Sequence, residues 1–586
     1  MTTQDDHTIG LAATLDSFAA EGSRFNIEQR LRQEVPQAVI STNRTKEQTD
    51  STAIQFAFTY TIQQKMINGK PRATIEGKYR NPDGTQSPPP VDEVPQEIVD
   101  SWADLSEKVN APYARARLEH LLFARRHGNA VEHAEKAITA YRKSSKTWKR
   151  SLDQINDLSM ALRLSRAIGN ASLSQEVMAE IISAATAALE SKENIPGISL
   201  RLIAVLATEP NAPAELDELL KKARSRYKGD PWIEEDVVDF QIDRASDATR
   251  ATLQDELVQI WLDAGEASAG IVRLGHLKKA LEIANRIGRN ELVNRAAAAI
   301  QATNPAELEL MSIKSTVNIS EEMIELLIQP VTSAPSWRDA LDEFARFGPI
   351  SGDRSTNEAR VQQQAQDFPL QAMLPPELLG GDGLPRFYAD TPERQFDVAL
   401  SKIESQQIKI YGAFLAEALH RIARTHGIPT EADLTDFFLS RKTVSEVIAG
   451  ALARAHIRFW TGDAEAVMFC TPPIIEALAR QLVIDTQQGV YRLQRQDSPG
   501  QYPGLGSLLG TLLTAGLDPS WFRYLHTLCT SIAGMNLRNE VAHGFTFGHS
   551  ASITATLLQA AGYLSCLAGT PDEADSDEGT GSAEPE

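Results

Sequence analysis

A recurring helix–glycine–helix pattern constrains this chain more than any other feature of its sequence. Each copy reads as the end of an amphipathic helix, a glycine stop, an asparagine and the start of a second helix. The copies lie at residues 120–129, 161–170 and 280–290. Gly128 and Gly169 are about 41 residues apart, and Gly288 follows about three such periods later. The spacing therefore predicts an array of helical hairpins.

Stacked hairpins of this length form solenoids, because one hairpin cannot bury its apolar face alone. Two further turns are expected near residues 209 and 249, where Pro210 and Ser246–Ala248 stand. We predict a solenoid-like helical-repeat domain over residues 96–345, with an irregular helical bundle as the alternative because the repeat is degenerate. Such an array can offer a concave surface to a partner or trigger, or it can act as a scaffold that spaces two ends.

The first 95 residues contain a strand-like pattern. Apolar residues occupy every second position from Ile54 to Ile62, which is the period of a half-buried strand. Asn68-Gly69 is a hairpin-turn dipeptide, and Ala73–Tyr79 can form the return strand. We predict a small β-hairpin in this N-terminal region, with a helix through Ile54–Met66 as the rival interpretation. Two short helices are predicted before it, over Ile9–Ala20 and Asn26–Gln33.

Polar and breaker-rich sequence separates the repeats from a second helical region. Residues 346–391 predict a linker or extended loop, and no long helix fits between about 348 and 391. Amphipathic segments resume at Pro392 and predict a helical bundle over residues 392–569. Residues 570–586 are acidic and rich in Gly, Ser and Pro, which is typical of a disordered tail. The predicted fold class is therefore mainly all-α.

Composition predicts a soluble, cytoplasmic protein. The formal charge of −20 over 586 residues argues against broad nonspecific binding to nucleic acid, although a local basic cleft is compatible with it. No run of apolar residues reads as a membrane span, and the acidic N-terminus lacks a secretory signal. The three cysteines and eleven histidines show no metal-ligand spacing, so neither a metal nor another cofactor is predicted.

The candidate site lies near the C-terminus, between two apolar segments. Asn536 can cap the start of a helix and Gly544 is the usual residue just past a helix end, so a short helix is expected. It would carry Arg538, Asn539 and His543, of which the last two emerge on one face. The arginine is about 140° around the helix from the histidine. A long guanidinium or a second copy of the chain could close that gap.

The string Arg-Asn-x-x-x-His-Gly, preceded by Asn-Leu, resembles the hallmark of the DUF4209 family, an all-helical group of the HEPN superfamily. Segments Pro473–Arg480 and Leu505–Leu513 are similar to the helices that precede the motif in that family. Ala479 stands where the family usually has leucine. The resemblance covers the last third of the chain, and it implies a HEPN-like helical domain there.

The resemblance also implies a function, because the Arg and His of this motif are associated with metal-independent RNA cleavage in active HEPN proteins. His543 would accept a ribose 2′-hydroxyl proton or donate one to the leaving 5′-oxygen. Arg538 would neutralise the developing phosphorane, and Asn539 would hold His543 or a phosphate oxygen. The product would carry a 2′,3′-cyclic phosphate. A homodimer through this domain is implied, and a role in stress response or phage defence fits the superfamily.

A noncatalytic alternative stays open for the same residues. Arg538 could pair with a buried carboxylate and His543 could cap a helix end, in a protein that serves as a helical scaffold or dimerisation module. Glu476, Arg480 and His549 are candidates for supporting groups, although each residue type more often lies on a surface or caps a helix.

Three other motifs are interpreted as structural. The pairs Arg115/His120 and Arg421/His426 repeat the Arg-x-x-x-x-His spacing and are expected on solvated helix faces. The glycine-rich run at 504–510 lacks the strand before it and the Lys-Ser/Thr after it that a phosphate-binding loop needs, so it reads as a loop before an apolar helix.

Overall fold

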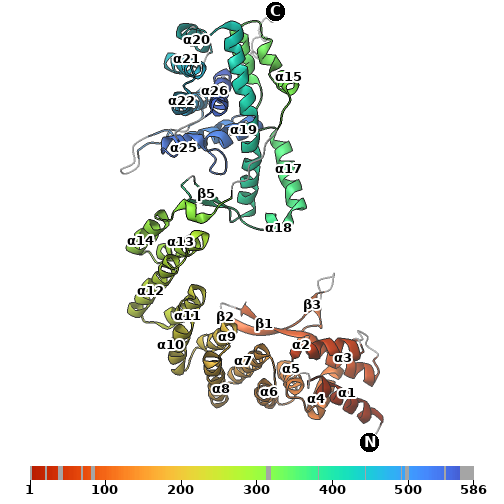
Figure 1. Ribbon diagram of the computed structural model, residues 1–586. Helices are drawn as coiled ribbons and strands as arrows, with labels where there is room; N and C mark the ends of the chain where they lie inside the picture. Colours follow the sequence, from red (N-terminus) through yellow and green to blue (C-terminus); the bar gives the residue numbers. More distant parts are fainter. Residues whose placement is uncertain are drawn as a thin grey trace, which may run out of the picture. The chain divides into compact units, whose positions relative to one another are not determined.

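The computed structural model describes the chain from residue 3 to residue 567, with several gaps. The gaps are 20–22, 37, 39–43, 68–69, 81–85, 194, 312–317, 381, 442–443, 490, 495–500 and 547–549. The structure is 73% helical with small pairs of strands, which confirms the mainly all-α prediction. The chain divides into two compact units, Met1–Ala302 (unit 1) and Thr303–Glu586 (unit 2), both drawn in Figure 1. The predicted tail over 570–586 lies outside the described residues.

Unit 1 begins with three helices and a β-hairpin. The helices are α1 (Thr3–Ala19), α2 (Arg24–Glu34) and α3 (Lys46–Thr59). The predicted hairpin is confirmed: β1 (Tyr60–Ile67) pairs antiparallel with β2 (Lys70–Gly77), with Tyr60 opposite Gly77. The expected turn dipeptide, residues 68–69, lies outside the described residues. A second short pair, β3 (Tyr79–Arg80) and β4 (Gln86–Ser87), follows.

The strand prediction is wrong for Ile54–Thr59, which forms the end of α3. Thr45 starts this helix through a capping box with Gln48. Almost every residue from 49 to 58 is buried, so the period of two seen among the larger apolar residues does not decide the structure. The Trp102 indole donates to the Ala53 carbonyl at 2.7 Å, which fixes the helix against the next element. The rival interpretation, a helix here, holds for these six residues.

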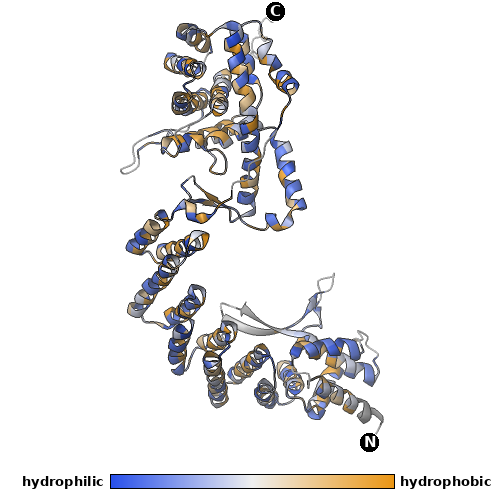
Figure 2. Cartoon of the chain, viewed as in Figure 1, coloured by the Kyte–Doolittle hydropathy of each residue, from blue (hydrophilic) through white to orange (hydrophobic). Residues whose placement is uncertain are grey.

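The remainder of unit 1 is a series of helix pairs. After η1 (Val91–Glu93) and α4 (Gln96–Lys108), the pairs are α5 (Pro112–Arg125) with α6 (Ala130–Ser145), α7 (Ser151–Ala167) with α8 (Ala171–Glu190), α9 (Pro196–Ala207) with α10 (Glu215–Tyr227), α11 (Pro231–Arg244) with α12 (Asp247–Glu266), and α13 (Gly270–Arg286) with α14 (Asn290–Gln301). Each helix packs on the ones before and after it. Figure 2 shows hydrophobic and hydrophilic residues sharing each of these helices, as stacking requires.

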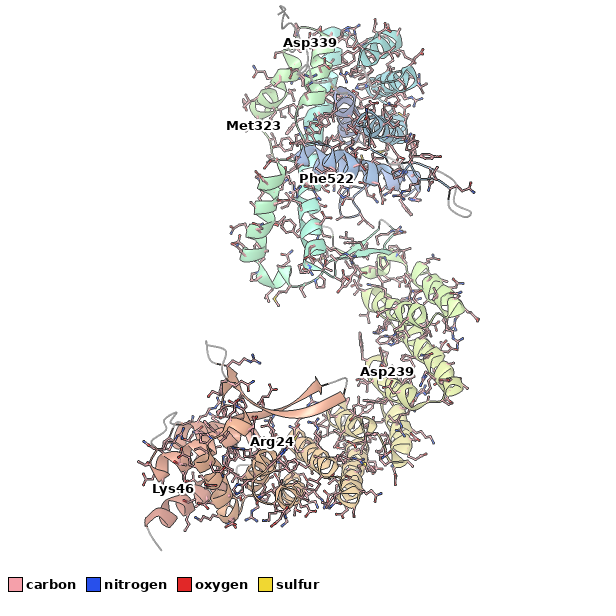
Figure 3. All side chains as sticks on the ribbon, turned by 180° about the vertical axis from the view of Figure 1, so that it is seen from behind. Arg24, Lys46, Asp239, Met323, Asp339 and Phe522 are labelled. Carbon is pink, nitrogen blue, oxygen red and sulfur yellow. The ribbon has the colours of Figure 1, made fainter. Side chains whose placement is uncertain are left out.

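The repeat period has a backbone cause. Gly128, Gly169 and Gly288 each end a helix in the left-handed region, with φ of 51°, 68° and 69°. The turn expected near residue 209 separates α9 from α10, and the one expected near 249 lies slightly earlier, with Ser246 capping α12. One hydrophobic core runs from α1 through α11, so the N-terminal helices pack with the repeats. Arg24 of α2, labelled in Figure 3, pairs with the fully buried Asp157 of α7.

Unit 2 is a helical bundle around α26. Its elements are η2 (Pro305–Leu308), α15 (Glu321–Thr332), α16 (Trp337–Arg346), α17 (Arg354–Asp367), α18 (Pro369–Ala372), β5 (Glu377–Leu379), β6 (Pro385–Tyr388), α19 (Pro392–His426), α20 (Glu431–Leu439), α21 (Glu446–Trp460), α22 (Ala464–Asp485), α23 (Leu505–Thr514), α24 (Pro519–Cys529), α25 (Leu537–Ala542) and α26 (Ala551–Cys566). Helix α26 packs on α16, α19, α21 and α22. The close approach of α26 to α19 needs a glycine on α19, because a Cβ on Gly412 would lie 2.8 Å from the Ser552 carbonyl oxygen of α26.

The expectation that no long helix fits between residues 348 and 391 is wrong, because α17 lies there. Asp353 caps its start by accepting from the Thr356 amide at 2.8 Å. The helix is mostly polar because it buries few residues, chiefly Asn357 and Val361. The Asn357 side chain bonds both the Ser351 carbonyl and Gln407 of α19. Polar contacts as well as apolar packing therefore hold this segment.

Among the described residues, α22 is long and apolar enough to cross a membrane by length and composition alone. However, 56% of the relevant window is buried inside the structure. A core helix of a soluble protein passes the same test, so α22 is weak evidence for a membrane span.

Candidate functional site

The candidate motif lies on α25, a six-residue helix between α24 and α26. It packs on α22 and α24, and its own first residue, Leu537, is buried. Gly544 follows the helix with a φ of 70°, as the sequence predicts. Asn536 precedes the helix but makes no cap, because its backbone is left-handed, with a φ of 51°. Its side-chain oxygen instead accepts from the side-chain Nδ2 of Asn539 at 2.7 Å.

The three predicted site residues are all accessible to solvent. His543 ends α25 and is exposed, and its ring centroid lies 6.1 Å from that of Phe545. Among the described residues its ring has no hydrogen-bond partner. The side chain of Arg538 is 35% exposed, and its Nη1 donates to Asn539 Oδ1 at 3.1 Å. The Asn539 side chain therefore supports Arg538 and not His543.

A carboxylate from α22 holds two arginines at this surface. Glu476 accepts from Arg538 Nε at 3.1 Å and lies 3.6 Å from Arg480 Nη2. Its side chain is 16% exposed. The side chains of both arginines are 35% exposed. Sequence reasoning named Glu476 and Arg480 as supporting candidates, and the structure brings both to the site, while His549 lies outside the described residues.

The position of α25 is fixed through α24. Arg523 of α24 bonds the fully buried Glu404 of α19 at 2.9 and 2.7 Å, and Thr527 donates to the same carboxylate. The turn before α25 is then tied back, because the Met535 amide donates to the Thr527 carbonyl at 2.8 Å. A Cβ on Gly534 would lie 2.4 Å from that carbonyl oxygen, so only glycine fits. The buried charge pair thus places the site on the bundle.

The other arginine–histidine pairs lie in different surroundings. The expectation of a solvated face is wrong for His120, which is buried and bonds the Tyr141 hydroxyl at 3.3 Å. Burial lowers the pKa of His120 to about 3, with a smaller contribution from the charge of Arg117. Arg421 is partly exposed and pairs with Glu417 on α19, with His426 at the end of the same helix. The glycine-rich run at 504–510 leads into the apolar α23.

Within the residues that the structure describes, no group of three or more His, Cys, Asp or Glu side chains could hold a metal ion. Cys529 is buried, which raises the pKa of its thiol to about 12.

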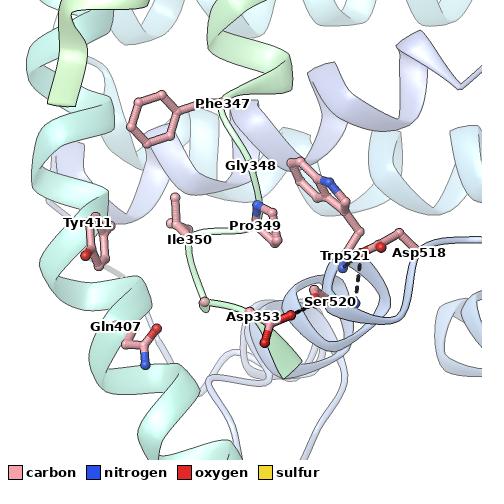
Figure 4. Close-up of a pocket in the computed structure, with 11 residues that line it drawn as sticks. Phe347, Gly348, Pro349, Ile350, Asp353, Gln407, Tyr411, Asp518, Ser520 and Trp521 are labelled. Carbon is pink, nitrogen blue, oxygen red and sulfur yellow. Dashed lines mark hydrogen bonds between the residues drawn. The ribbon is translucent and has the colours of Figure 1, made fainter. Parts of the chain in front are cut away.

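Sequence reasoning missed a cavity of about 480 Å³ in unit 2, shown in Figure 4. Its walls include Phe347, Tyr411 and Trp521, with Asp353 and Asp518 among the lining residues. Hydrogen bonds from Ser355 and Thr356 lower the pKa of Asp353 to about 2. Both carboxylates are used as helix caps, Asp353 for α17 and Asp518 for α24. Three segments far apart in the sequence form it, and no local pattern could have indicated it.

Comparison with known proteins gives one match, to the family described as "Domain of unknown function (DUF7380)", over residues 27–176. The matched segment lies in unit 1, from α2 into α8. No curated protein and no solved structure matches the chain.

The family match corrects the resemblance drawn from the C-terminal motif. The assignment to DUF4209 and to the HEPN superfamily is wrong, since the family found is a different one and lies elsewhere in the chain. The C-terminal region is a helical bundle, but the HEPN label for it has no support. The physical reason is the shortness of the motif. Its geometry is set locally by the left-handed Asn536, the six-residue α25 and Gly544, which does not require a particular surrounding fold.

Proposed function

We propose that unit 2 binds RNA at the surface of α25 and cleaves it without a metal, using His543 and Arg538. One observation carries this proposal: an exposed imidazole and a partly exposed guanidinium stand on one short helix at the protein surface. The proposal rests on the chemistry of these two groups and on no family relationship. It places the activity in the cytoplasm.

The reaction is an attack of the ribose 2′-oxygen on the neighbouring phosphorus. As the oxygen–phosphorus bond forms, the 2′-hydroxyl proton passes to a ring nitrogen of His543. The bond from phosphorus to the 5′-oxygen breaks, and this oxygen takes a proton from water. The hydroxide left behind takes the proton from His543, which restores the neutral imidazole. Arg538 stabilises the extra negative charge of the phosphorane. The products are a 2′,3′-cyclic phosphate and a 5′-hydroxyl, so no oxidant or co-reactant is needed.

A specific contact favours the second candidate, a noncatalytic scaffold. Glu476 already compensates part of the charge of Arg538 and Arg480. In that case the three side chains would only fix α25 on α22. The homodimer through unit 2 stays a prediction, and sedimentation of the purified chain would test it.

Cleavage assays with matched variants separate the two candidates. The full chain is incubated with total RNA in EDTA, alongside the variants His543→Ala and Arg538→Ala. A catalytic imidazole contributes about 100- to 10,000-fold, so His543→Ala should lose that factor in rate. His426→Ala is the control, because His426 follows Arg421 at the same spacing on a different helix, α19. Equal rates for the wild type and His543→Ala would favour the scaffold.

We also propose that unit 1 binds a protein partner along one edge of its helix pairs. Exposed apolar residues recur at the N-terminal ends of α9, α11 and α13, at roughly the period of the pairs. They are Ile195, Trp232, Ile271 and Val272, with Trp232 62% exposed. Large apolar side chains in a regular row are typical of an interaction surface. A partner recovered with the wild type and lost with Trp232→Ser would support this, and equal recovery would contradict it.

A further inference from the structure

We infer that the α25 surface takes single-stranded RNA, with unpaired bases stacked on exposed aromatic rings to either side of Arg538 and His543. The inference names the substrate class of the proposed function and so rests on it. We call these rings, Tyr491, Tyr502 and Phe545, the aromatic track. Their exposed fractions are 54%, 40% and 50%.

One end of the aromatic track adjoins Arg538 through a chain of contacts. Glu476 holds Arg538 and Arg480 together, and the Arg480 guanidinium carbon lies 5.5 Å from the centroid of the Tyr502 ring. The Tyr491 ring lies 5.1 Å from Tyr502, at an interplanar angle of 70°.

The backbone between the two tyrosines fixes this end of the track. Arg492 and Gln501 exchange two backbone hydrogen bonds, of 3.0 and 2.9 Å. These bonds lie next to Tyr491 and Tyr502, so they hold the pair of exposed rings in place.

The other end of the aromatic track adjoins His543. Phe545 has its ring 6.1 Å from the imidazole, and the Arg386 guanidinium carbon lies 4.6 Å from the Phe545 centroid. Arg386 also pairs with Asp382. Arg538 and His543 are therefore each linked to an arginine and at least one exposed aromatic ring.

This composition fits an unpaired strand better than a duplex. Every base has an aromatic face that can stack on a ring, but in a duplex these faces are already occupied by neighbouring base pairs. The partly exposed Arg386, Arg480 and Arg538 match the phosphates of a strand that crosses α25. Three guanidiniums face two carboxylates here, Asp382 and Glu476, so these five side chains together keep one positive charge on a chain with a formal charge of −20.

Binding is measured with the full chain carrying His543→Ala, so that the RNA stays intact. The probes are a fluorescein-labelled RNA of about twelve nucleotides and the duplex of the same sequence. The single strand should bind at least about tenfold more tightly than the duplex. Tyr502→Leu and Phe545→Leu should each weaken single-strand binding by about 5- to 100-fold, because each removes one stacking surface.

Conservative and control variants make the measurement decisive. Tyr502→Phe and Phe545→Trp keep a ring and should keep the affinity. Phe368→Leu removes a ring that is 60% exposed on another part of unit 2 and should change nothing. If circular dichroism shows that Tyr502→Leu does not fold, the affinity of Phe545→Leu alone decides whether the aromatic track binds RNA.

Three results would overturn the inference: no binding of the single strand, equal affinity for the duplex, or no loss in either leucine variant. Failure of the proposed function is read separately, from cleavage by the wild type. Binding that depends on the aromatic track without cleavage rejects catalysis and keeps the track. Cleavage without dependence on the rings rejects the track and keeps catalysis.

Discussion

The buried pair between Arg523 and Glu404 gives a quantitative test of how α25 is positioned. Glu404 is fully buried and receives three bonds from the guanidinium, at 2.7, 2.9 and 3.2 Å, and one from the Thr527 hydroxyl. The substitution Glu404→Gln removes the charge and leaves a guanidinium that is only 9% exposed. Breaking a buried pair by removing one partner costs about 3–5 kcal/mol. Asp397 remains within 2.7 Å, so we expect the low end, about 3 kcal/mol.

The assay must report on unit 2 alone, because a chain of two compact units need not unfold in one step. Hydrogen exchange read by peptide mass spectrometry across a urea titration gives a separate transition for the peptides of α19 and α24. Glu417→Gln is the control on the same helix, since its pair with Arg421 is partly exposed and worth about 0–1 kcal/mol. A loss below about 1 kcal/mol for Glu404→Gln would refute the reasoning.

Three further predictions follow from single residues. Gly288→Ala should destabilise unit 1 by about 1 kcal/mol although the space around Gly288 is empty, because its φ is 69°. Gly275→Ala should instead stabilise unit 1 by about 0.5–1 kcal/mol, because Gly275 lies inside α13 and is equally uncrowded. Chemical denaturation of both variants decides, and equal effects would contradict us. Lowering the pH from about 7 to about 5 should reduce the unfolding free energy of unit 1 by about 2 kcal/mol, because His120 has a pKa of about 3 when folded and about 6.5 when unfolded. Its contribution is complete above pH 6.5 and is lost as the pH falls. Urea titrations at both pH values measure this, and the same loss of unfolding free energy in His120→Gln would refute it. Glu476→Gln should strengthen RNA binding by removing the charge that compensates Arg538, and fluorescence anisotropy showing weaker binding would mean that the carboxylate is needed to hold the guanidinium in place.

The helical repeats could be predicted because their signal is local. Gly128, Gly169 and Gly288 occupy left-handed positions that few other residues tolerate, so their spacing reveals the turns directly. The error at Ile54–Thr59 has the opposite cause. A segment buried on all sides carries little periodicity, and its contact with Trp102 comes from a distant part of the chain.

The candidate site could be foreseen only in part. The helix, its glycine stop and the presence of Arg538, Asn539 and His543 on it follow from adjacent residues. The pairing of Arg538 with Glu476 and the approach of Arg386 to Phe545 join distant segments, which no local pattern specifies. The short motif was also too small to identify a family.

The most direct test of the central claim is the cleavage of one RNA with and without a single 2′-hydroxyl. The wild type should cut the all-ribose strand in EDTA and leave a 2′,3′-cyclic phosphate, whereas His543→Ala should cut about 100-fold more slowly or worse. Replacing the ribose at the cleaved position with 2′-deoxyribose should abolish cutting there. Cutting of the deoxy-substituted strand at that position, or an undiminished rate in His543→Ala, would contradict the account.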